Sequence, residues 1–288
     1  MVKSINMLVS VIVITHNHGR YLENCLKALL NQTFQELEII IIDDVSVDNT
    51  RDVVQSFPSE KIKYFRNNEH KYIAASRNIG VRKASGKYIF FTDADCEPVK
   101  HWLQEGITCF LETNCDAVEG KTLAEHQNFG ACYHFVENLS GGQYQTCNMG
   151  YKKESLVKAG MFNEKYSLAY EDVDLALRVK KKGEIIFCKD MLVFHKLVPW
   201  NPKHLLLNAK RAKFKVLLVK EHNYREILTF GILEKNSLIQ VLFPFLIPFY
   251  FRIQSFRDLF ILPIIFGRSV LHRVIVWKTA IEEKYFIL

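Results

Sequence analysis

The 288-residue chain is long enough for one large domain, or for one domain and an appendage, and 49% of its residues are hydrophobic, enough for a buried core. Its net charge of +7 is uneven: residues 1–200 contain 24 Lys and Arg against 25 Asp and Glu (net −1), and residues 201–288 contain 14 against 6 (net +8). This distribution argues against a basic nucleic-acid-binding body and favours contact between the C-terminal segment and an anionic partner, with a membrane surface as the first candidate.

The cysteines and the N-terminal segment indicate a cytoplasmic protein. The seven cysteines are odd in number and form no C-x-x-C pair, as expected of free thiols in a reducing compartment. The apolar run at residues 7–15 follows Lys3, as in a secretory signal, but no small-residue cleavage site follows the run. We therefore interpret it as the first, buried strand of a sheet.

Up to about residue 95, short β-branched runs alternate with helical stretches. The pattern predicts strands at 7–15, 37–43, 61–65 and 87–91, and helices at 20–32, 48–57 and 74–84. Strands that are apolar throughout and separated by helices indicate an open, mostly parallel, Rossmann-like α/β sheet covered on both faces. Such sheets bind their ligands at the carboxyl ends of the strands.

Beyond residue 95 the alternation is weaker. It predicts a helix at 99–112, a strand at 115–122, a polar loop at 138–145 and a strand at 184–188, followed by an apolar segment at 191–196. A helix from about residue 171 has Val173, Leu177 and Val179 or Lys180 marking its turns, and Gly183 closes it. These elements complete a predicted domain of residues 1–200.

Residues 201–288 form a predicted basic and apolar helical extension. Apolar residues recur at steps of three and four, with lysines and arginines around them, as in an amphipathic helix: Leu205, Ala209, Ala212, Val216 and Val219. The apolar runs at 238–251 and 259–267 are shorter than the ~20 residues of a spanning helix, and prolines 244, 248 and 263 interrupt them. We expect a monotopic, interface-embedded segment; the alternatives are a helical subdomain that packs on the body and a tail used for dimer contacts.

Three polar clusters follow predicted strands, and we expect them to meet at one crevice: residues 15–17, Asp43 with Asp44, and residues 93–95. In an extended chain Asp93 and Asp95 point to the same side, so both can reach one cation. Hard oxygen ligands suit Mg²⁺ or Mn²⁺, which also bind phosphate oxygens. A D-x-D string alone is weak evidence, because most acids at strand ends are only solvated.

The surrounding sequence makes this pattern more specific. Six blocks occur in order: VSVIVITHN, CLKALLNQT, EIIIIDDVSVDNT, AASRNIGVRKASGKYIFFTDADCEP, NMGYKKESLVKAGMFNEKY and YEDVDLALRVKKKG. Together they resemble the inverting GT-A glycosyltransferases of family 2, over roughly residues 8–196. The resemblance implies a metal-dependent enzyme that moves a sugar from a nucleoside diphosphate sugar, most often a UDP-sugar, to an acceptor hydroxyl.

The resemblance also implies roles for individual residues. Thr15, with Asn17 beside it, and Arg77 match positions near the base and the diphosphate. Asp43 and Asp44 match the acidic pair of which one contacts the base, usually uracil. Asp93, also placed near the nucleotide, and Asp95 match the metal-binding pair, with Asp95 preferred as the direct ligand.

Two further positions match on the acceptor and metal sides. Glu171 and Asp172 match the pair from which a carboxylate takes the proton of the acceptor hydroxyl. As a structural alternative, both acids also suit the start of a helix. His195 matches a histidine that faces the metal or diphosphate in some members, or is a satisfied core residue.

The chemistry supports these roles independently. Sugar transfer needs a divalent ion to neutralise the leaving diphosphate and a carboxylate base near the incoming hydroxyl. One base without a nucleophilic carboxylate fits a single displacement with inversion.

The sequence departs from the family at two places. Val45 stands where the family usually has Gly, so we expect that turn to be made differently and the base contacts to change. His16 replaces a usual aromatic residue. The absence of a Q-x-x-R-W string favours single additions over processive synthesis.

Other functions fit less well. A nucleotidyltransferase should have a glycine-rich loop after the first strand, and a dehydrogenase should have a G-x-G-x-x-G motif. A catalytically silent nucleotide-sugar-binding protein should lack a metal ligand or the base, and this chain has both. The basic tail favours a lipid-linked sugar or glycan acceptor in cell-surface polysaccharide or glycolipid synthesis, on the inner face of the membrane, with a soluble glycan or peptide as the alternative.

Overall fold

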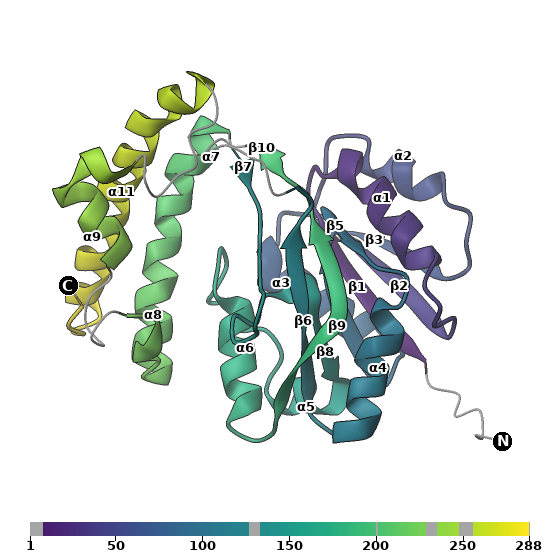
Figure 1. Ribbon diagram of the computed structural model, residues 1–288. Helices are drawn as coiled ribbons and strands as arrows, with labels where there is room; N and C mark the ends of the chain where they lie inside the picture. Colours follow the sequence, from purple (N-terminus) through teal and green to yellow (C-terminus); the bar gives the residue numbers. More distant parts are fainter. Residues whose placement is uncertain (1–7, 127–132, 200, 229–234, 248–255, 288) are drawn as a thin grey trace. The chain divides into compact units, whose positions relative to one another are not determined.

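The computed structural model describes residues 8–126, 133–199, 201–228, 235–247 and 256–287, and the chain divides into two compact units (Figure 1). The first unit consists of residues 1–125, 136–167 and 171–196. The second consists of residues 126–135, 168–170 and 197–288. Two short segments from the middle of the chain therefore belong with its C-terminal part.

The first unit is built on a sheet of eight strands in the order β3-β2-β1-β4-β8-β6-β9-β5. Four neighbouring pairs are parallel and join β1 (Val9–Thr15) to β2 (Leu37–Asp43) and β4 (Tyr88–Asp93), β2 to β3 (Ile62–Arg66), and β6 (Ala117–Ala124) to β9 (Ile185–His195). The antiparallel pairs involve β8 (Met149–Lys152), which lies between β4 and β6, and β5 (Cys96–Pro98), which pairs with β9. The predicted open, mostly parallel α/β sheet is confirmed.

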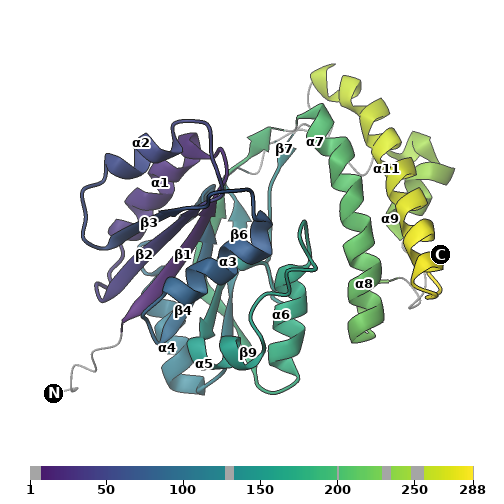
Figure 2. The same cartoon turned by 180° about the vertical axis from the view of Figure 1, so that it is seen from behind.

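Helices cover both faces of this sheet, as Figures 1 and 2 show from opposite sides. One face is covered by α1 (Gly19–Leu30) and α4 (Trp102–Thr113), with α2 (Thr50–Gln55) packed beside α1; the other face is covered by α3 (Tyr72–Lys83), α5 (Lys153–Lys158) and α6 (Glu171–Lys180). Alternate residues of each strand serve the two faces: Val11 packs with the leucines of α1, and Ile12 packs with α3. The strands are therefore apolar throughout because both of their faces are buried.

Within this sheet the sequence pattern missed β5 and β8 and ended β9 too early. β5 and β8 have three and four residues, too few for a periodic signal. The strand predicted at 184–188 and the segment at 191–196 form one strand, β9, and the exposed Lys189 and Asp190 lie in an irregularity where the pairing shifts after Gly120. A bulge thus resembled the end of a strand.

The predicted register of α6 is wrong. The helix buries Leu175 and Val179 completely or nearly so, whereas Val173 and Leu177 are only half-buried. Its buried side also includes the acids Glu171 and Asp174, which pair with Arg77 and Arg178. Because acidic residues share the inward side, hydrophobic periodicity alone assigns the wrong face.

The second unit is mainly helical. It contains α7 (Pro202–Leu207), a 3₁₀ turn (Asn208–Arg211), α8 (Ala212–His222), α9 (Lys235–Leu242), a 3₁₀ turn (Pro244–Leu246) and α11 (Phe256–Glu282), besides a two-stranded pairing of β7 (Tyr133–His134) with β10 (Val198–Pro199). The five apolar positions predicted to line one face from Leu205 to Val219 are all buried. The amphipathic pattern is confirmed, although a 3₁₀ turn divides it between α7 and α8.

Prolines affect the two apolar runs differently. α9 ends just before Pro244, as predicted, and Pro248 lies outside the described residues. The prediction for Pro263 is wrong, because α11 passes through it and continues for 27 residues in all. Among the described residues, one stretch, Asp258–Glu282 of α11, is long and apolar enough to cross a membrane, with a mean hydropathy of 1.8.

Candidate active site

The carboxyl ends of the central parallel strands lie level at one edge of the sheet. In the pairing register Thr15 lies opposite Asp43, Ile14 lies opposite Asp93, and Asp43 lies opposite Arg66. The polar clusters that follow β1, β2 and β4 therefore lie together at this edge, as the sequence predicts.

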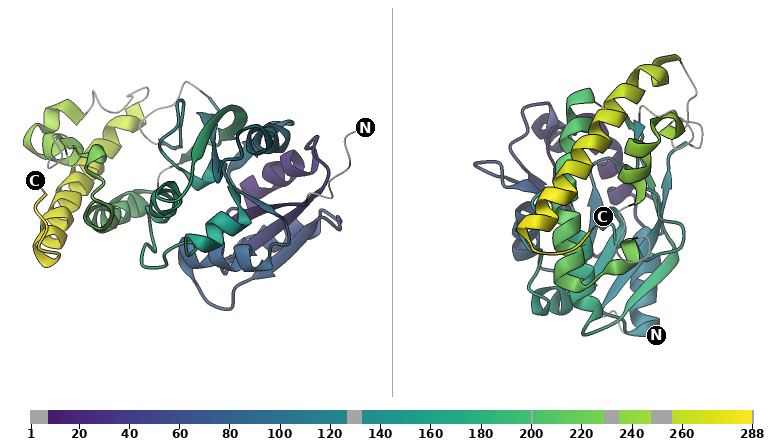
Figure 3. Two further views of the ribbon diagram at one scale, coloured as in Figure 1. Left: turned by 90° about the horizontal axis from the view of Figure 1, so that it is seen from below. Right: turned by 90° about the vertical axis from the view of Figure 1, so that its left-hand side faces the viewer.

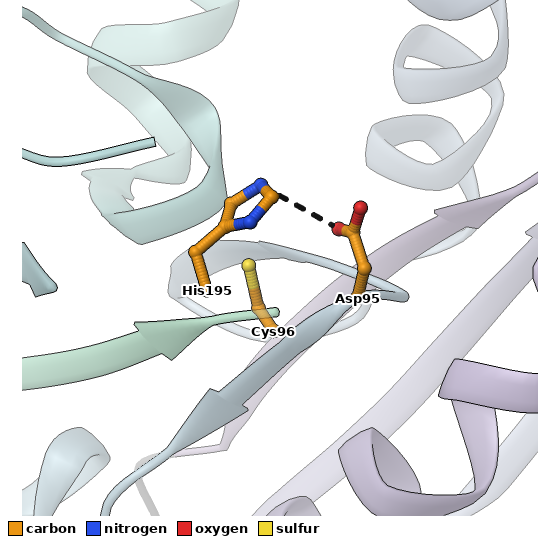
Figure 4. A group of neighbouring side chains, drawn as sticks. All are labelled: Asp95, Cys96 and His195. Carbon is orange, nitrogen blue, oxygen red and sulfur yellow. Dashed lines mark ion pairs between the residues drawn. The ribbon is translucent and has the colours of Figure 1, made fainter. Parts of the chain in front are cut away.

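Asp95 and His195 are brought together by the short strand β5. Cys96 pairs with His195 across the antiparallel β5–β9 ladder, so the residue before β5 lies beside the histidine ring (Figure 4). Nε2 of His195 is 3.8 Å from Oδ1 of Asp95. Nδ1 of His195 lies 2.7 Å from the carbonyl oxygen of Lys196, and because a carbonyl only accepts, Nδ1 carries the hydrogen. In the neutral ring Nε2 then has a lone pair on the side of Asp95, as a metal ligand requires.

Asp95 is buried beside a second carboxylate, Asp93. Burial raises the pKa of Asp95, His195 lowers it, and the neighbouring Asp93 raises it again, with a net increase. A divalent cation would offset the repulsion between the two carboxylates. Burial also raises the pKa of the adjacent Cys96 thiol, whose sulfur lies within 4.8 Å of the ligand atoms of Asp95 and His195.

Arg77 connects the D-x-D motif with the Glu171–Asp172 pair. Its side chain is 3% exposed; Nη2 lies 3.3 Å from Oδ1 of Asp93 and Nη1 lies 2.5 Å from Oε1 of Glu171. Burial lowers the pKa of Arg77, but the charges of Glu171, Asp93 and Asp172 outweigh this and the net pKa is raised. The two groups of acids predicted to act together are therefore held by one guanidinium.

The two acids at the start of α6 have different environments. Glu171 is buried against Arg77, whereas Asp172 is half-buried and accepts the backbone N–H of Val173 at 2.8 Å. Of the two carboxylates, Asp172 is the one that solvent reaches, which suits a proton acceptor.

Asp43 is fully buried and is bonded to the turn that follows β2 and to the neighbouring strand β3. It accepts hydrogen bonds from the Ser46 N–H at 2.7 Å, the Tyr64 hydroxyl at 2.5 Å and Arg66 at 3.0 Å. Burial, with the adjacent Asp43 charge, raises the pKa of Tyr64 to about 12, so the hydroxyl stays a donor. Asp43 therefore fixes the turn after β2.

Asp44 caps the helix that carries Arg77. Its carboxylate accepts the backbone N–H groups of Lys71 at 2.8 Å and Tyr72 at 3.0 Å, at the start of α3, and the Asn67 amide at 2.8 Å. Nδ1 of His70 lies 2.8 Å from Oδ2 of the same carboxylate. The Asp44 carboxylate is therefore already engaged by α3, Asn67 and His70.

The sequence analysis missed an aromatic cluster around Asp44. The His70 ring lies 4.3 Å from that of Tyr72 and 4.9 Å from that of His16, and Nδ1 of His16 lies 2.6 Å from the Asp44 carbonyl oxygen. Tyr72 has φ +65, which is rare for an aromatic residue. Only His16 was singled out from the sequence; His70 lies in the loop before α3 and Tyr72 is the first residue of α3, ahead of the predicted helix at 74–84.

Thr15 and Asn17 differ in their surroundings. The Thr15 hydroxyl is buried and has no hydrogen-bond partner among the residues that the structure describes, which fits a group that contacts a ligand. Asn17 instead accepts the Val47 N–H at 2.7 Å and donates its own backbone N–H to Ser46 at 2.9 Å. Asn17 thus holds the turn that follows β2.

The turn at Val45 is not made differently, contrary to expectation. Val45 has φ +58, so a β-branched residue adopts the left-handed conformation that favours glycine. The bonds from Asp43 and Asn17 on either side hold the turn in place. The substitution therefore adds strain and leaves the path of the backbone as glycine would have it.

The chain is similar in sequence to known proteins. The model of Glycosyl transferase family 2 matches residues 10–164. The chain belongs to glycosyl transferase family 2. Glycosyltransferase AglE of Haloferax volcanii is 24% identical over 207 residues, which cover 67% of this chain and 68% of AglE. WfaP of Escherichia coli, a UDP-Glc:alpha-D-GlcNAc-diphosphoundecaprenol beta-1,3-glucosyltransferase, is 29% identical over 189 residues, 61% of this chain and 71% of WfaP. This family 2 chain is thus a glycosyltransferase enzyme.

Solved structures agree on the fold. S. aureus TarS 1-349 in complex with UDP-GlcNAc matches with a TM-score of 0.60 at 16% identity, over 97% of this chain and 93% of that one. Mannosyltransferase PcManGT from Pyrobaculum calidifontis, in complex with GDP-Man and Mn²⁺, matches with a TM-score of 0.58 at 18% identity, over 95% and 73%. The family 2 chain has the GT-A fold.

Proposed function

We propose that this chain transfers a single sugar from a nucleoside diphosphate sugar, a UDP-sugar first of all, to an acceptor hydroxyl with inversion at the anomeric carbon. The observation that carries the proposal is the Arg77 bridge, with Asp93 at 3.3 Å and Glu171 at 2.5 Å. It brings the donor-side acids and the acceptor-side acids to one place, as a single displacement requires.

The donor set around Asp95 fits a divalent cation. Ligand atoms of Asp95, His195 and Cys96 lie within 4.8 Å of one another, and Mn²⁺ accepts the oxygen and imidazole ligands among them. Asp93, two residues before Asp95, is proposed as a further carboxylate, and Mg²⁺ would use the carboxylates. Such an ion would supply Lewis-acid neutralisation of the leaving diphosphate. The complex of PcManGT with Mn²⁺ and GDP-Man supports this assignment.

On the nucleotide side, Thr15 and Asp44 are the proposed contacts of the ribose and base, and Arg77 with Asp93 lies toward the diphosphate. The complex of TarS with UDP-GlcNAc supports a uridine nucleotide. Asp43 and Asn17 support these contacts by fixing the turn after β2.

On the acceptor side, Asp172 takes the proton of the incoming hydroxyl while the oxygen attacks the anomeric carbon and the nucleoside diphosphate leaves. Glu171, held by Arg77, positions the start of α6. Because the displacement is a single step, the product has the opposite anomeric configuration.

We further propose a lipid-linked sugar as the acceptor, at the cytoplasmic face of the membrane. WfaP, as its name states, acts on GlcNAc-diphosphoundecaprenol, and the net charge of +8 in residues 201–288 favours an anionic surface. Such a reaction belongs to cell-surface polysaccharide or glycolipid synthesis.

A donor screen with the full-length protein tests the proposal. UDP-, GDP- and dTDP-sugars are incubated with GlcNAc-diphosphoundecaprenol and with Mn²⁺, Mg²⁺ or EDTA, and the linkage is assigned by NMR. We expect metal-dependent transfer from a UDP-sugar with inversion. Equal turnover in EDTA, or a retained configuration, would contradict the mechanism.

Substitution of the base separates catalysis from helix stability. Asp172→Asn should lower kcat at least about 100-fold while the Kd for UDP stays unchanged. Glu154→Gln is the matched control, because Glu154 is also an acid in the first turn of a helix, α5, and its loss should leave transfer unchanged. Unchanged transfer by Asp172→Asn would remove Asp172 from the mechanism.

A further inference from the structure

Within the second unit, one whole side of α11 is exposed and apolar. We call this side the outer face of α11 and define it by its exposed apolar residues: Phe256, Leu259, Phe260, Pro263, Phe266, Val270, Leu271, Val274, Trp277 and Ile281. They recur at steps of mostly three and four residues, so they form one stripe along the helix. Over the 27 residues of α11 this stripe is about 40 Å long.

The opposite side of α11 already has its packing partners (Figure 3, yellow helix against the green ones). Ile261 and Ile265 pack with Leu205 of α7, and Val276 and Ala280 pack with α8. Ser269 donates a hydrogen bond to Gln240 of α9 at 2.5 Å. One side of α11 thus contributes to the core of the second unit, whereas the outer face stays exposed.

A helix at a water-exposed surface normally has polar residues on its outer side. Among the described side chains of α11, the exposed charged ones are Lys278 and Glu282, near the C-terminal end of the helix. Nζ of Lys278 lies 3.8 Å from Oε1 of Glu282. Phe260 is 68% exposed, Val274 51% and Ile281 78%. An apolar stripe of this length marks a surface that another phase or molecule covers.

We propose that the outer face of α11 inserts into the surface of an anionic lipid bilayer, with the helix lying in the membrane plane. The charge of the unit favours lipid over a second copy of the chain: residues 201–288 have a net charge of +8, and Lys210, Arg211, Lys213 and Lys220 are exposed. Two such units would repel each other, whereas anionic headgroups attract them. Phenylalanine and tryptophan side chains on the apolar side are typical of interfacial helices.

The inner side of α11 argues for an in-plane helix and against a spanning one. It carries two buried charged residues, Arg273, 1% exposed, and Asp258, 2% exposed. A spanning α11 would have to separate from α7, α8 and α9, or take the lysines of α8 into the hydrocarbon with it. The proposal that α11 binds a bilayer rests on the proposed function in one respect: a lipid-linked acceptor would lie in the same membrane.

Vesicle flotation of the full-length protein tests the docking, without donor or acceptor. We expect the protein to float with phosphatidylcholine vesicles that contain phosphatidylglycerol, and to bind at least about tenfold more weakly to pure phosphatidylcholine or at high salt. Trp277, 45% exposed, should shift its fluorescence to shorter wavelength on binding. A protein that stays with the soluble fraction and shows no shift would overturn the proposal.

Charge substitutions identify the face. Val274→Asp and Phe260→Asp should weaken vesicle binding at least about tenfold, whereas Leu111→Asp, at a 58% exposed apolar position of α4 in the first unit, should not. Vesicle binding that survives both outer-face changes would overturn the proposal. So would a wild-type dimer that Val274→Asp dissociates, in the absence of vesicle binding.

Depth and activity complete the test. In a Trp277→Phe background, a Val270→Trp substitution places a probe midway along α11, and lipids brominated near the headgroup should quench it more than lipids brominated at the chain ends. The reverse order would show a spanning helix and overturn the in-plane assignment. Transfer to a water-soluble acceptor analogue should persist in the outer-face variants; if the wild type floats but transfers nothing, the proposed function fails while the docking stands.

Discussion

The guanidinium of Arg77 lies 2.5 Å from Glu171 and 3.3 Å from Asp93, and so joins the end of β4 to the start of α6. The Arg77 side chain is 3% exposed and the Glu171 side chain 5%, so their pair is buried, whereas Asp93 is 32% exposed. Arg77 therefore neutralises the acid at the helix start while Asp93 keeps a side toward solvent. This single residue relates the two halves of the proposed chemistry.

A double-substitution cycle tests this bridge. Arg77→Met should lower the free energy of unfolding by about 3–5 kcal/mol, because it removes the cation that compensates the buried Glu171. Adding Glu171→Gln should recover at least about 1 kcal/mol of that loss. Lys27→Met, at an exposed pair with Glu23, should cost less than about 1 kcal/mol. Strictly additive effects in urea unfolding would contradict a buried pair.

Much of the fold follows from the sequence for a physical reason. The strands β1, β2 and β4 are buried on both faces and therefore mostly apolar, and the acids at the ends of β2 and β4 are brought level by the sheet. The Asp95–His195 contact agrees with the family resemblance, but hydrophobic periodicity gives no sign of it, because it depends on β5, a strand of three residues. The Arg77 bridge could not be predicted either, since it depends on packing between α3 and α6.

Local rules fail where other groups hold the chain. The inward face of α6 was misassigned because Arg77 and Arg178 neutralise acids on its buried side. Val45 was expected to change its turn, yet neighbouring hydrogen bonds impose a positive φ on it. In both cases tertiary contacts outweigh the local propensity.

The His70–Asp44 contact gives a prediction about donor binding. Because Nδ1 of His70 lies 2.8 Å from the Asp44 carboxylate, we expect His70 to compete for this carboxylate with the base proposed to bind it. His70→Ala should therefore lower the Kd for UDP by roughly threefold to tenfold, the value of about one hydrogen bond. Isothermal titration measures this, with His101→Ala at an exposed histidine of the same unit as the control. Weaker UDP binding by His70→Ala would mean that His70 contacts the nucleotide instead of competing with it.

Val45 and Val47 offer a matched pair for backbone strain. Val45 has φ +58, whereas Val47, two residues on and 88% exposed, does not have a positive φ. Val45→Gly should raise the free energy of unfolding by about 0.5–1 kcal/mol, since relief of strain exceeds the added entropy of the unfolded chain. Val47→Gly should lower it by about 0.5–1 kcal/mol, because only the entropy changes. If both variants are equally destabilised, the strain at Val45 is negligible.

Glu38 should make the stability of the chain depend on pH. It is a buried carboxylate of β2 that accepts hydrogen bonds from the Ser10 hydroxyl, the Ser85 N–H and Lys63, each at 2.5 Å. Burial raises the pKa of Glu38, but the hydrogen bonds of Lys63, Ser10 and Ser85 outweigh it, and the net pKa lies below its ordinary value of 4.5. The ionised form is therefore the one that the fold favours.

The sign of the effect follows from that direction. A carboxylate with a lowered pKa in the folded state stabilises the protein above its unfolded pKa, and this contribution is lost as the pH falls from about 4.5 through the folded value. Glu38→Gln should thus cost about 1–3 kcal/mol at pH 7 in urea unfolding, and the difference from wild type should shrink as the pH falls below 4.5. Glu36→Gln, at an exposed acid two residues away, should cost little at any pH. A Glu38→Gln deficit that stays constant down to strongly acidic pH would show that the lost contacts do not depend on the charge of Glu38.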